Sequence, residues 1–194
     1  DRVKDYINEI YKSNVRSIAL VRNLLSVSRI DQGRINNMPE VVNVIDLVKK
    51  IVKEMTTIAV KNKVMLFLAK KQKDIPEIFI DPQRLREVIE NLVSNAIKYN
   101  VPNGKVVVSV ERDKDRVLFK VEDTGMGIAK KDQKKLFVKF FRTEKAAKTN
   151  SEGTGLGLYV ANSYIQGWGG KLAIESEEGK GATFSFVIPI KANK

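Results

Sequence analysis

The sequence of 194 residues contains no cysteine and no histidine, and each absence excludes a kind of chemistry. Without cysteine there can be no disulfides and no thiolate metal sites. Without histidine there is no imidazole general acid–base catalysis on this chain. No apolar run approaches the roughly 18 residues that a membrane-spanning helix needs, and no signal peptide is recognisable. We therefore expect a chain without membrane contact, with chemistry that rests on other side chains.

The composition is that of a globular protein with a basic excess. Hydrophobic residues make up 43 % and charged residues 30 %, and 35 Lys and Arg against 23 Asp and Glu give a formal charge of +12. Such an excess can indicate nucleic acid or an anionic membrane surface, but it also fits a polyphosphate ligand or an acidic protein partner. Aromatic residues are only 7 % and no nucleic-acid-binding motif is present, so we expect no nucleic acid partner.

The strongest pattern is an amphipathic helix predicted from Asp81 to Tyr99. Asp81 and Pro82 suit the N-cap and the first turn. The predicted buried face consists of Leu85, Val88, Ile89, Leu92, Val93, Ala96 and Ile97, at helical spacing.

A polar stripe follows the same helix. Asn91, Asn95 and Lys98 are separated by four and three residues, so they lie on one side. An amide oxygen suits a magnesium ion that bridges phosphates, and an ammonium one turn away can pair with those phosphates. The alternative is a solvated surface, and the glycine motifs further along the chain decide between the two.

The remaining pattern predicts an α+β fold, a two-layer α/β sandwich with a long N-terminal helix. The long helix runs from Val3 to about Ile30, stops at Gly33, and has one apolar face that needs a partner. Further helices are predicted at 46–59, with Asp46 as N-cap, at 130–141 and at 156–164. Strands are predicted at 41–45, 64–69 (buried), 78–81, 105–111, 116–122, 171–175 and 182–190, mostly antiparallel.

Two parts are expected, residues 1–36 and 40–194, joined by a linker with Asn36, Asn37 and Pro39. The sequence starts inside a helical pattern and without an initiator Met, so we expect it to be a piece of a longer protein.

Two glycine motifs supply candidate ligand contacts. In the motif Asp123-Thr-Gly-Met-Gly127, a carboxylate at a strand end can accept from an exocyclic amine such as that of adenine, and the glycines let backbone approach a flat ligand. The motif Gly153-Thr-Gly-Leu-Gly-Leu158 opens a helix, whose free N–H groups and dipole favour an anion. Each motif alone also occurs in ordinary turns, and neither matches a dinucleotide fingerprint or a P-loop.

A cationic segment separates the two glycine motifs. It is either a solvated basic loop or a lid over a triphosphate, which needs glycine hinges and cations. Its cations are Lys130, Lys131, Lys134, Lys135, Lys139, Arg142, Lys145 and Lys148.

In this order, the motifs resemble those of the catalytic, ATP-binding domain of two-component sensor histidine kinases, in the GHKL superfamily. Residues 91–99 match the asparagine box, 123–127 the first glycine box, 137–141 the phenylalanine box and 153–158 the second glycine box. Residues 179–186 match the terminal strand pair. Residues 24–34 look like the end of the second helix of the dimerisation and histidine-phosphotransfer hairpin.

The resemblance implies a Bergerat-type ATP-binding fold and a role for each matching residue. Asn95 would bind Mg²⁺, Asn91 and Lys98 would contact the phosphates, and Arg142 would be a candidate for the γ-phosphate. Tyr99 would lie near the sugar and ring, and Asp123 would hold the adenine amine, with Thr183 helping through water. The other implied nucleotide-binding residues are Gly125, Gly127, Ile128, Phe137, Gly153, Thr154, Gly155, Leu156, Gly157 and Leu158.

The resemblance also implies partners. In the family, ATP phosphorylates a histidine on the first hairpin helix, and the phosphoryl group passes to a response-regulator receiver domain. The parent would be a homodimer through the helical hairpin, and this part of it cytoplasmic, as the soluble portion of a membrane-bound sensor. Because the chain has no histidine, we expect it to bind ATP without phosphorylating itself on histidine.

Two alternatives remain. A GHL-type ATPase, of the gyrase B and heat-shock chaperone class, has a glutamate base one turn before the magnesium asparagine. This chain has Asn91 there, and the adjacent Glu90 is displaced by about 100° around the helix. The other alternative is a non-catalytic regulatory module that binds nucleotide without turnover.

Overall fold

The structure is a computed structural model that describes residues 2–34, 37–69, 75–149 and 153–190. The chain divides into two compact units, Asp1–Asn36 and Asn37–Lys194, and the division falls at the predicted linker. Each unit is described by itself.

The first unit is the helix α1 (Arg2–Asp31), as predicted. It ends through Gly33, whose φ of 65° reverses the chain. The Gly33 N–H donates to the Ile30 carbonyl at 3.0 Å and the Arg34 N–H to the Arg29 carbonyl at 2.9 Å, which satisfies carbonyls of the last turn. Among the described residues, no helix is long and apolar enough to span a membrane.

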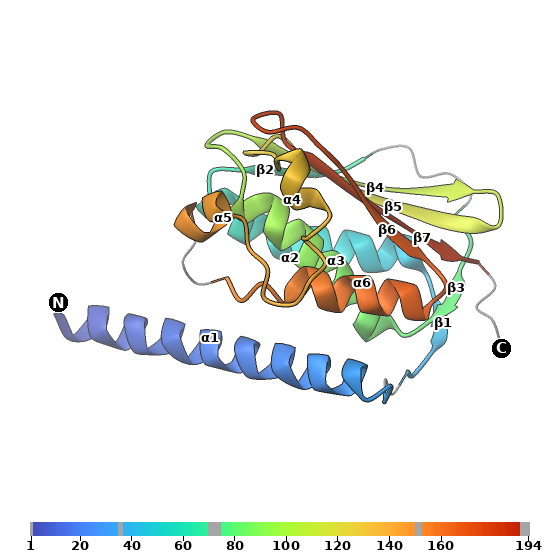
Figure 1. The fold of residues 1–194 in the computed structure, drawn as a ribbon, viewed down its shortest axis with the longest axis horizontal. Helices are drawn as coiled ribbons and strands as arrows, with labels where there is room; N and C mark the ends of the chain where they lie inside the picture. The colour runs from blue at the N-terminus through green and yellow to red at the C-terminus, as the bar shows by residue number, and fades with distance from the viewer. Residues whose placement is uncertain (1, 35–36, 70–74, 150–152, 191–194) are drawn as a thin grey trace. The chain divides into compact units, whose positions relative to one another are not determined.

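Five strands of the second unit form one sheet in the order β2-β4-β5-β7-β6 (Figure 1). Only the β2–β4 pair is parallel among the described strands, so the prediction of mostly antiparallel pairing is confirmed. The strands are β2 (Met65–Leu68), β4 (Lys105–Asp113), β5 (Arg116–Asp123), β6 (Lys171–Ser176) and β7 (Ala182–Pro189). A separate antiparallel pair consists of β1 (Glu40–Val42) and β3 (Ile78–Ile80).

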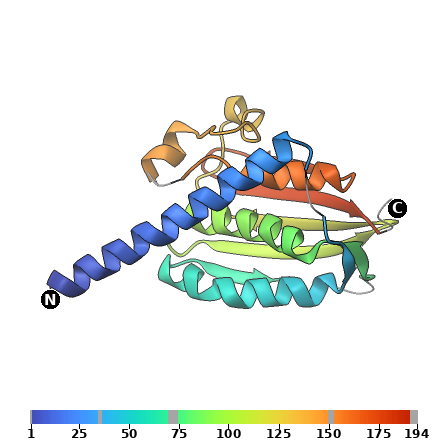
Figure 2. The same cartoon turned by 90° about the horizontal axis from the view of Figure 1, so that it is seen from below.

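Three helices cover one face of the sheet, as the two views show: α2 (Val44–Lys61), α3 (Pro82–Lys98) and α6 (Gly157–Gly167) (Figures 1 and 2). All seven predicted apolar positions of α3 are buried against the sheet and the neighbouring helices. On the sheet, alternate residues of β4, β5 and β7 are buried, and Phe119 stacks on Phe186 with ring centroids 4.6 Å apart. The predicted two-layer α+β sandwich is confirmed.

Two boundaries on this side of the domain differ from the prediction. The N-cap of α2 is Asn43, not Asp46, because the Asn43 amide oxygen accepts from the Asp46 backbone N–H at 3.1 Å. The strand before it accordingly has three residues. The strand predicted as buried at 64–69 is the edge strand β2, in which Met65 and Phe67 are 51 % and 48 % exposed.

The helix predicted at 130–141 is largely absent. Only α4 (Lys130–Gln133) forms, followed by turns and by the unpredicted helix α5 (Glu144–Thr149). Phe140 has a φ of 62°, and its N–H donates to the Gly155 carbonyl at 3.1 Å. A backbone contact with a segment fifteen residues further along thus replaces the local helical pattern.

Candidate functional site

The last two turns of α3 carry the predicted polar stripe. Asn91 and Asn95 are half-buried and Lys98 is exposed, whereas the opposite side of the helix is in the core. At the far end, the Asp81 carboxylate caps α3 by accepting from the backbone N–H groups of Gln83 and Arg84 at 3.0 and 3.1 Å. The polar side chains are therefore mounted on a rigid helix with a defined start.

Asn91 faces the second glycine motif, at the start of α6. A Cβ atom added at Gly157 would lie 3.0 Å from the Asn91 amide oxygen, so any larger residue there would make that side chain shift by a few tenths of an ångström. No side chain caps the N-terminus of α6 among the described residues. Its first N–H groups are thus available beside Asn91, in the arrangement that binds phosphate at helix starts.

The first glycine motif lies against the other side of the end of α3. The Met126 N–H donates to the Tyr99 carbonyl at 3.0 Å. A Cβ atom at Gly125 would collide with that same carbonyl and would lie 2.7 Å from the Asp123 carboxylate. Absence of a side chain at residue 125 therefore lets the strand end and the helix end meet.

The turn between β6 and β7 packs against the first glycine motif. Gly127 has a φ of 62°, and a Cβ atom there would collide with the Glu177 carbonyl, while Gly181 makes an equally close approach to the Asp123 carbonyl. The Ile128 N–H donates to the Ser176 hydroxyl at 2.9 Å, which donates to the Gly181 carbonyl at 2.7 Å.

Asp123 ends β5 at the centre of this arrangement. Burial raises the pKa of its carboxyl group from an ordinary 3.8 to about 6, although the backbone N–H groups of Gly125 and Ala182 favour the charged form. The Gly125 N–H lies 2.8 Å from its Oδ1. A half-buried acceptor between glycines is suited to an exocyclic amine on a flat base.

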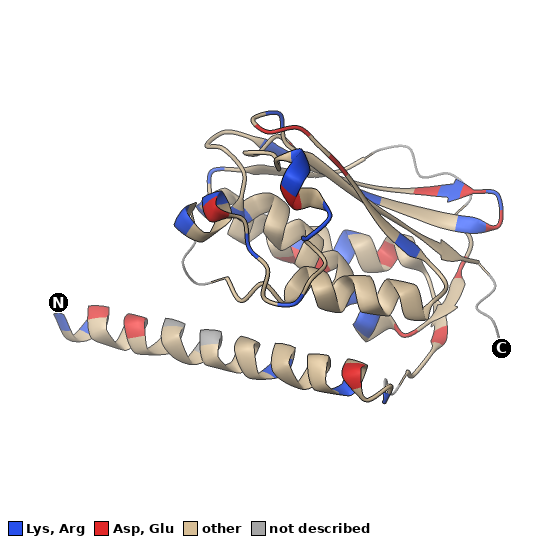
Figure 3. Cartoon of the chain, viewed as in Figure 1, with Lys and Arg blue, Asp and Glu red and all other residues tan. Residues whose placement is uncertain are grey.

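The cationic segment lies beside both glycine motifs, and Figure 3 shows the Lys and Arg residues of its helices α4 and α5 in blue. A Cβ atom at Gly153 would lie 3.2 Å from the guanidinium carbon of Arg142. On the other side, the Lys145 ammonium donates to the Met126 carbonyl at 3.5 Å and pairs with Glu178 at 3.6 Å. The segment thus contacts the second glycine motif through Arg142 and Phe140 and the first through Lys145.

A family model described as histidine kinase-, DNA gyrase B- and HSP90-like ATPase matches residues 80–192. The chain belongs to this family. By sequence and fold, it is an ATP-binding catalytic domain of the two-component histidine kinase type, as the resemblance of its motifs predicts.

Relatives agree with this placement. The circadian input-output histidine kinase CikA of Synechococcus elongatus is 33 % identical over 190 residues, 97 % of this chain and 25 % of that protein. The sensor histidine kinase WalK of Bacillus subtilis is 34 % identical over 184 residues, 91 % of this chain and 29 % of that protein. The chain thus spans between 25 % and 29 % of the length of these two kinases.

Solved structures of histidine kinases share the fold. Full-length ShkA in complex with AMPPNP has a TM-score of 0.83 and 26 % identity, over 98 % of this chain and 39 % of that one. The catalytic domain of histidine kinase ThkA has a TM-score of 0.70 and 28 % identity, over 80 % of this chain and 97 % of that one.

In this histidine kinase domain, the strand register separates two residues that the resemblance places together. The pairing of β5 with β7 places Ala182 opposite Asp123, and Thr183 opposite Glu122. Because side chains alternate along a strand, Thr183 lies on the other face of the sheet from Asp123. The residue opposite the Asp123 carboxylate is thus Ala182, and the structure does not bring Thr183 to that carboxylate.

Of the other predicted residues, Ile128, Phe137, Thr154 and Leu158 are half-buried and Leu156 is fully buried. The Thr154 hydroxyl accepts from the Leu156 N–H at 3.3 Å, within the second glycine motif. The structure therefore gives Leu156 a packing role, since its side chain is in the core.

Sequence analysis missed two residues that shape the first glycine motif. The Gln133 amide donates to the Ile128 carbonyl at 3.0 Å and to the Ser176 carbonyl at 2.8 Å, which ties α4 to the end of β6. Ser176 and Gln133 are 43 residues apart, and neither belongs to a recognisable pattern, so no signal in the sequence marks them.

The structure also bears on the predicted GHL-type alternative. Arg86 binds Glu54 of α2 at 2.7 Å and Glu90 at 2.9 Å. Glu90 therefore pairs on the side of α3 that faces α2, whereas Asn91 faces α6. Glu90 therefore does not occupy the position that the catalytic glutamate has in the GHL-type ATPases, which is the position of Asn91 in this chain.

A magnesium ion fits the donor set only together with phosphates. Among the described residues, no group of three Asp, Glu, His or Cys side chains could hold a metal ion by itself. The half-buried amide of Asn95, one turn beyond Asn91 on α3, offers one hard oxygen ligand. Such a site suits Mg²⁺, which keeps several waters and takes ligands from substrate phosphates.

Proposed function

We propose that this domain binds Mg²⁺–ATP between α3, the two glycine motifs and the cationic segment, and donates the γ-phosphoryl group to a histidine on another segment or chain. The supporting observation is the meeting of three parts distant in sequence: Asn91 against Gly157, and Gly125 against the end of α3. The arrangement has an amine acceptor at one end and free helix N–H groups at the other.

Each end has a role in the proposed complex. Asp123 accepts from the adenine amine, Gly125 and Gly127 keep the backbone close to the ring, and Tyr99 lies beside them at the end of α3. Asn91, Lys98 and the N–H groups at the start of α6 hold the phosphates. Arg142 neutralises charge on the γ-phosphate, and Asn95 holds Mg²⁺ through its amide oxygen.

Transfer then depends on position and charge, as phosphoryl transfer generally does. Bound Mg²⁺ supplies charge neutralisation between the phosphates. The side chains of this domain orient the γ-phosphate and exclude water, and the accepting imidazole comes from outside, because the chain contains no histidine. We therefore expect the chain alone to bind ATP without forming phosphohistidine.

The wider context is also a proposal. In the parent protein, α1 would be the second helix of a hairpin that forms a homodimer through a four-helix bundle. The phosphoryl group would pass to the receiver domain of a response regulator, in the cytoplasm. The exposed apolar side chains of α1 are consistent with a helical partner: Val3, Ile7, Ile10, Ile18 and Val21.

Calorimetric titration with AMPPNP, with and without Mg²⁺, tests the nucleotide site. We expect magnesium-dependent binding that is weakened at least tenfold by Asn95→Ala, and a loss of preference for adenine over guanine in Asp123→Ala. Gln83→Ala is the matched control, because Gln83 is exposed at the opposite end of the same helix.

Unchanged binding in Asn95→Ala would contradict the assigned magnesium contact. A folded chain without any AMPPNP binding would refute the proposed function and leave a regulatory module that does not use nucleotide.

A further inference from the structure

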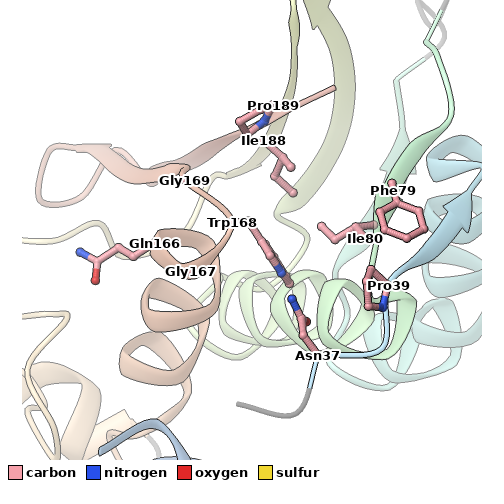
Figure 4. Close-up of a pocket in the computed structure, with 10 residues that line it drawn as sticks. All are labelled: Asn37, Pro39, Phe79, Ile80, Gln166, Gly167, Trp168, Gly169, Ile188 and Pro189. Atoms are coloured by element: carbon pink, nitrogen blue, oxygen red, sulfur yellow. The ribbon is translucent and has the colours of Figure 1, made fainter. Parts of the chain in front are cut away.

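A cavity of about 320 Å³ lies at the end of the domain remote from the glycine motifs (Figure 4). Its walls come from the segment before β1, from β3 just before α3 begins, from the last residues of α6 and from the end of β7. The lining residues are Asn37, Pro39, Phe79, Ile80, Gln166, Gly167, Trp168, Gly169, Ile188 and Pro189.

The cavity is separate from the proposed nucleotide site. The nucleotide motifs use the C-terminal end of α3 and the N-terminal end of α6, whereas the cavity lies where α3 starts and α6 ends. No residue of the two glycine motifs or of the asparagine box lines it.

The inner walls are rigid. Ile80 and Ile188 belong to the core, with 2 % and 3 % of their surface exposed. Trp168 is held by stacking on Tyr164, at 6.3 Å between ring centroids. Tyr164 is held in turn by Arg84, which lies 5.0 Å from its ring centre and donates to its hydroxyl at 2.7 Å. The indole thus packs against a tyrosine that Arg84 holds by a hydrogen bond.

The outer wall is also anchored. The Met38 N–H, between Asn37 and Pro39, donates to the second carboxylate oxygen of Asp81 at 3.0 Å. Asp81 is only 5 % exposed and uses its other oxygen to cap α3. This segment is therefore tied to the domain where it forms the cavity wall.

The lining has a distinct chemistry. Among the residues that the structure describes, the lining contains no charged side chain, and its apolar surface is aromatic and proline-rich. In Figure 4 the Asn37 amide and the Trp168 ring point toward each other, whereas the Gln166 side chain points away. The polar side-chain groups that point toward each other in Figure 4 are thus the Asn37 amide and the Trp168 ring. A volume near 300 Å³ is at the lower end of small-molecule sites.

We propose that this cavity is a second ligand site, which takes an uncharged, flat ring compound carrying a hydrogen-bonding group such as a carboxamide. The aromatic walls pack the ring, Asn37 pairs with its amide, and the uncharged lining disfavours ions, because burying an unpaired charge is costly. The proposal does not depend on nucleotide binding.

Trp168 provides a direct readout, since it is the sole tryptophan of the chain. Protein labelled with 5-fluorotryptophan has one ¹⁹F resonance, at the cavity. We expect 2-naphthamide to shift this resonance saturably. The matched ligand 2-naphthoate has the same rings with a carboxylate, and we expect it to bind at least tenfold more weakly despite the net charge of +12.

A pair of variants at one position separates filling of the cavity from changes to the helix. A Cβ atom at Gly167 would have no other atom within 4 Å, so side chains are accepted there. We expect Gly167→Phe to abolish the 2-naphthamide shift and Gly167→Ala to retain it.

Three results would overturn the proposal. They are no shift with 2-naphthamide, a naphthoate affinity equal to that of the amide, and a shift that persists unchanged in Gly167→Phe. If a proline-rich peptide shifts the resonance and 2-naphthamide does not, the cavity would instead belong to a site for a protein partner. AMPPNP titration of the same samples is independent, so failure here leaves the proposed function standing.

Discussion

The carboxylate of Asp123 is proposed to bind the nucleotide, but its burial destabilises the folded domain when no nucleotide is bound. Its pKa is raised to about 6, chiefly because burial disfavours the charged form. The proposed contact with an adenine amine requires that charged form, so the domain without nucleotide contains a charge that is poorly solvated. In the proposed function, the contact with the adenine amine compensates for this unfavourable burial.

Replacement of this carboxylate should therefore stabilise the unliganded domain. The folded-state pKa is above the unfolded value of 3.8, so this group stabilises the fold fully below about pH 4 and loses that contribution as pH rises through 6. We expect Asp123→Asn to unfold with a free energy about 1–3 kcal/mol above wild type at pH 7, and with little difference near pH 4. Urea unfolding across this range measures it.

The same variant should bind AMPPNP more weakly, because an amide cannot serve the amine as an ionised acceptor does. Asp113→Asn, at an exposed position of the β4–β5 hairpin, is the control. An Asp123→Asn variant that is less stable than wild type at pH 7 would show that the Gly125 and Ala182 contacts outweigh the burial of the charge.

Among the elements of the domain, α3 and α6 each have two ends that differ in their contacts. α3 begins at a buried cap, Asp81, and ends with the polar stripe. α6 begins at the second glycine motif, without a side-chain cap among the described residues, and ends beside the cavity. An uncapped helix start is thermodynamically unfavourable by itself, and an anion at that start compensates for the missing cap.

Because α3 and α6 approach each other closely at Gly157, we expect one added methyl group at this position to affect nucleotide affinity. Gly157→Ala would place a Cβ atom 3.0 Å from the Asn91 amide oxygen, which displaces that side chain. We expect AMPPNP affinity to fall about tenfold, or ~1.4 kcal/mol, with the fold retained by circular dichroism. Gly167→Ala, in the last turn of the same helix, is the control and should leave affinity unchanged. Equal affinities in both variants would remove Asn91 from the phosphate site.

The N-caps of α2 and α3 differ in their contacts, so we expect their replacement by alanine to lower the free energy of unfolding by different amounts. Asp81 is buried and accepts three backbone N–H groups, two of α3 and that of Met38. Asn43 is exposed and accepts one. We expect Asp81→Ala to lower the free energy of unfolding by about 2–4 kcal/mol, and Asn43→Ala by about 1 kcal/mol. Similar costs in urea unfolding would show that water satisfies the donors released at residue 81.

For the whole molecule, the basic excess is the dominant feature. Several of its cations lie on the segment between the two glycine motifs, where Arg142 contacts Gly153 and Lys145 contacts Met126. Charge placed there attracts a polyphosphate at long range, and dissolved salt screens that attraction.

The dependence of affinity on salt should therefore distinguish binding of the phosphates from binding of the adenosine part of the nucleotide. We expect AMPPNP affinity to fall about tenfold between low salt and about 0.5 M, whereas binding of adenosine, which has no phosphate, should change less than twofold. Titration at fixed pH and Mg²⁺ measures both. An adenosine affinity that falls in parallel would indicate a general effect on the fold instead of an effect on phosphate contacts.

Local patterns determined much of this protein. The buried face and N-cap of α3, the stop of α1 at Gly33, the β4–β5 hairpin and the order of the motifs all depend on residues close in sequence. Each was predicted from local spacing or from local residue types. The family follows from the same motifs, because their residue types and order are visible without a fold.

Only the tertiary structure decided the rest. The predicted helix at 130–141 gives way to turns because the Phe140 backbone pairs with Gly155. Strand β2 lies at the edge of the sheet, with no strand on its outer side among the described residues. The face occupied by Thr183 depends on the register of β5 and β7, two strands that are far apart in the chain. Likewise, the meeting of Asn91 with Gly157 and the cavity beside Trp168 depend on how distant segments pack, and local spacing carries no information about that.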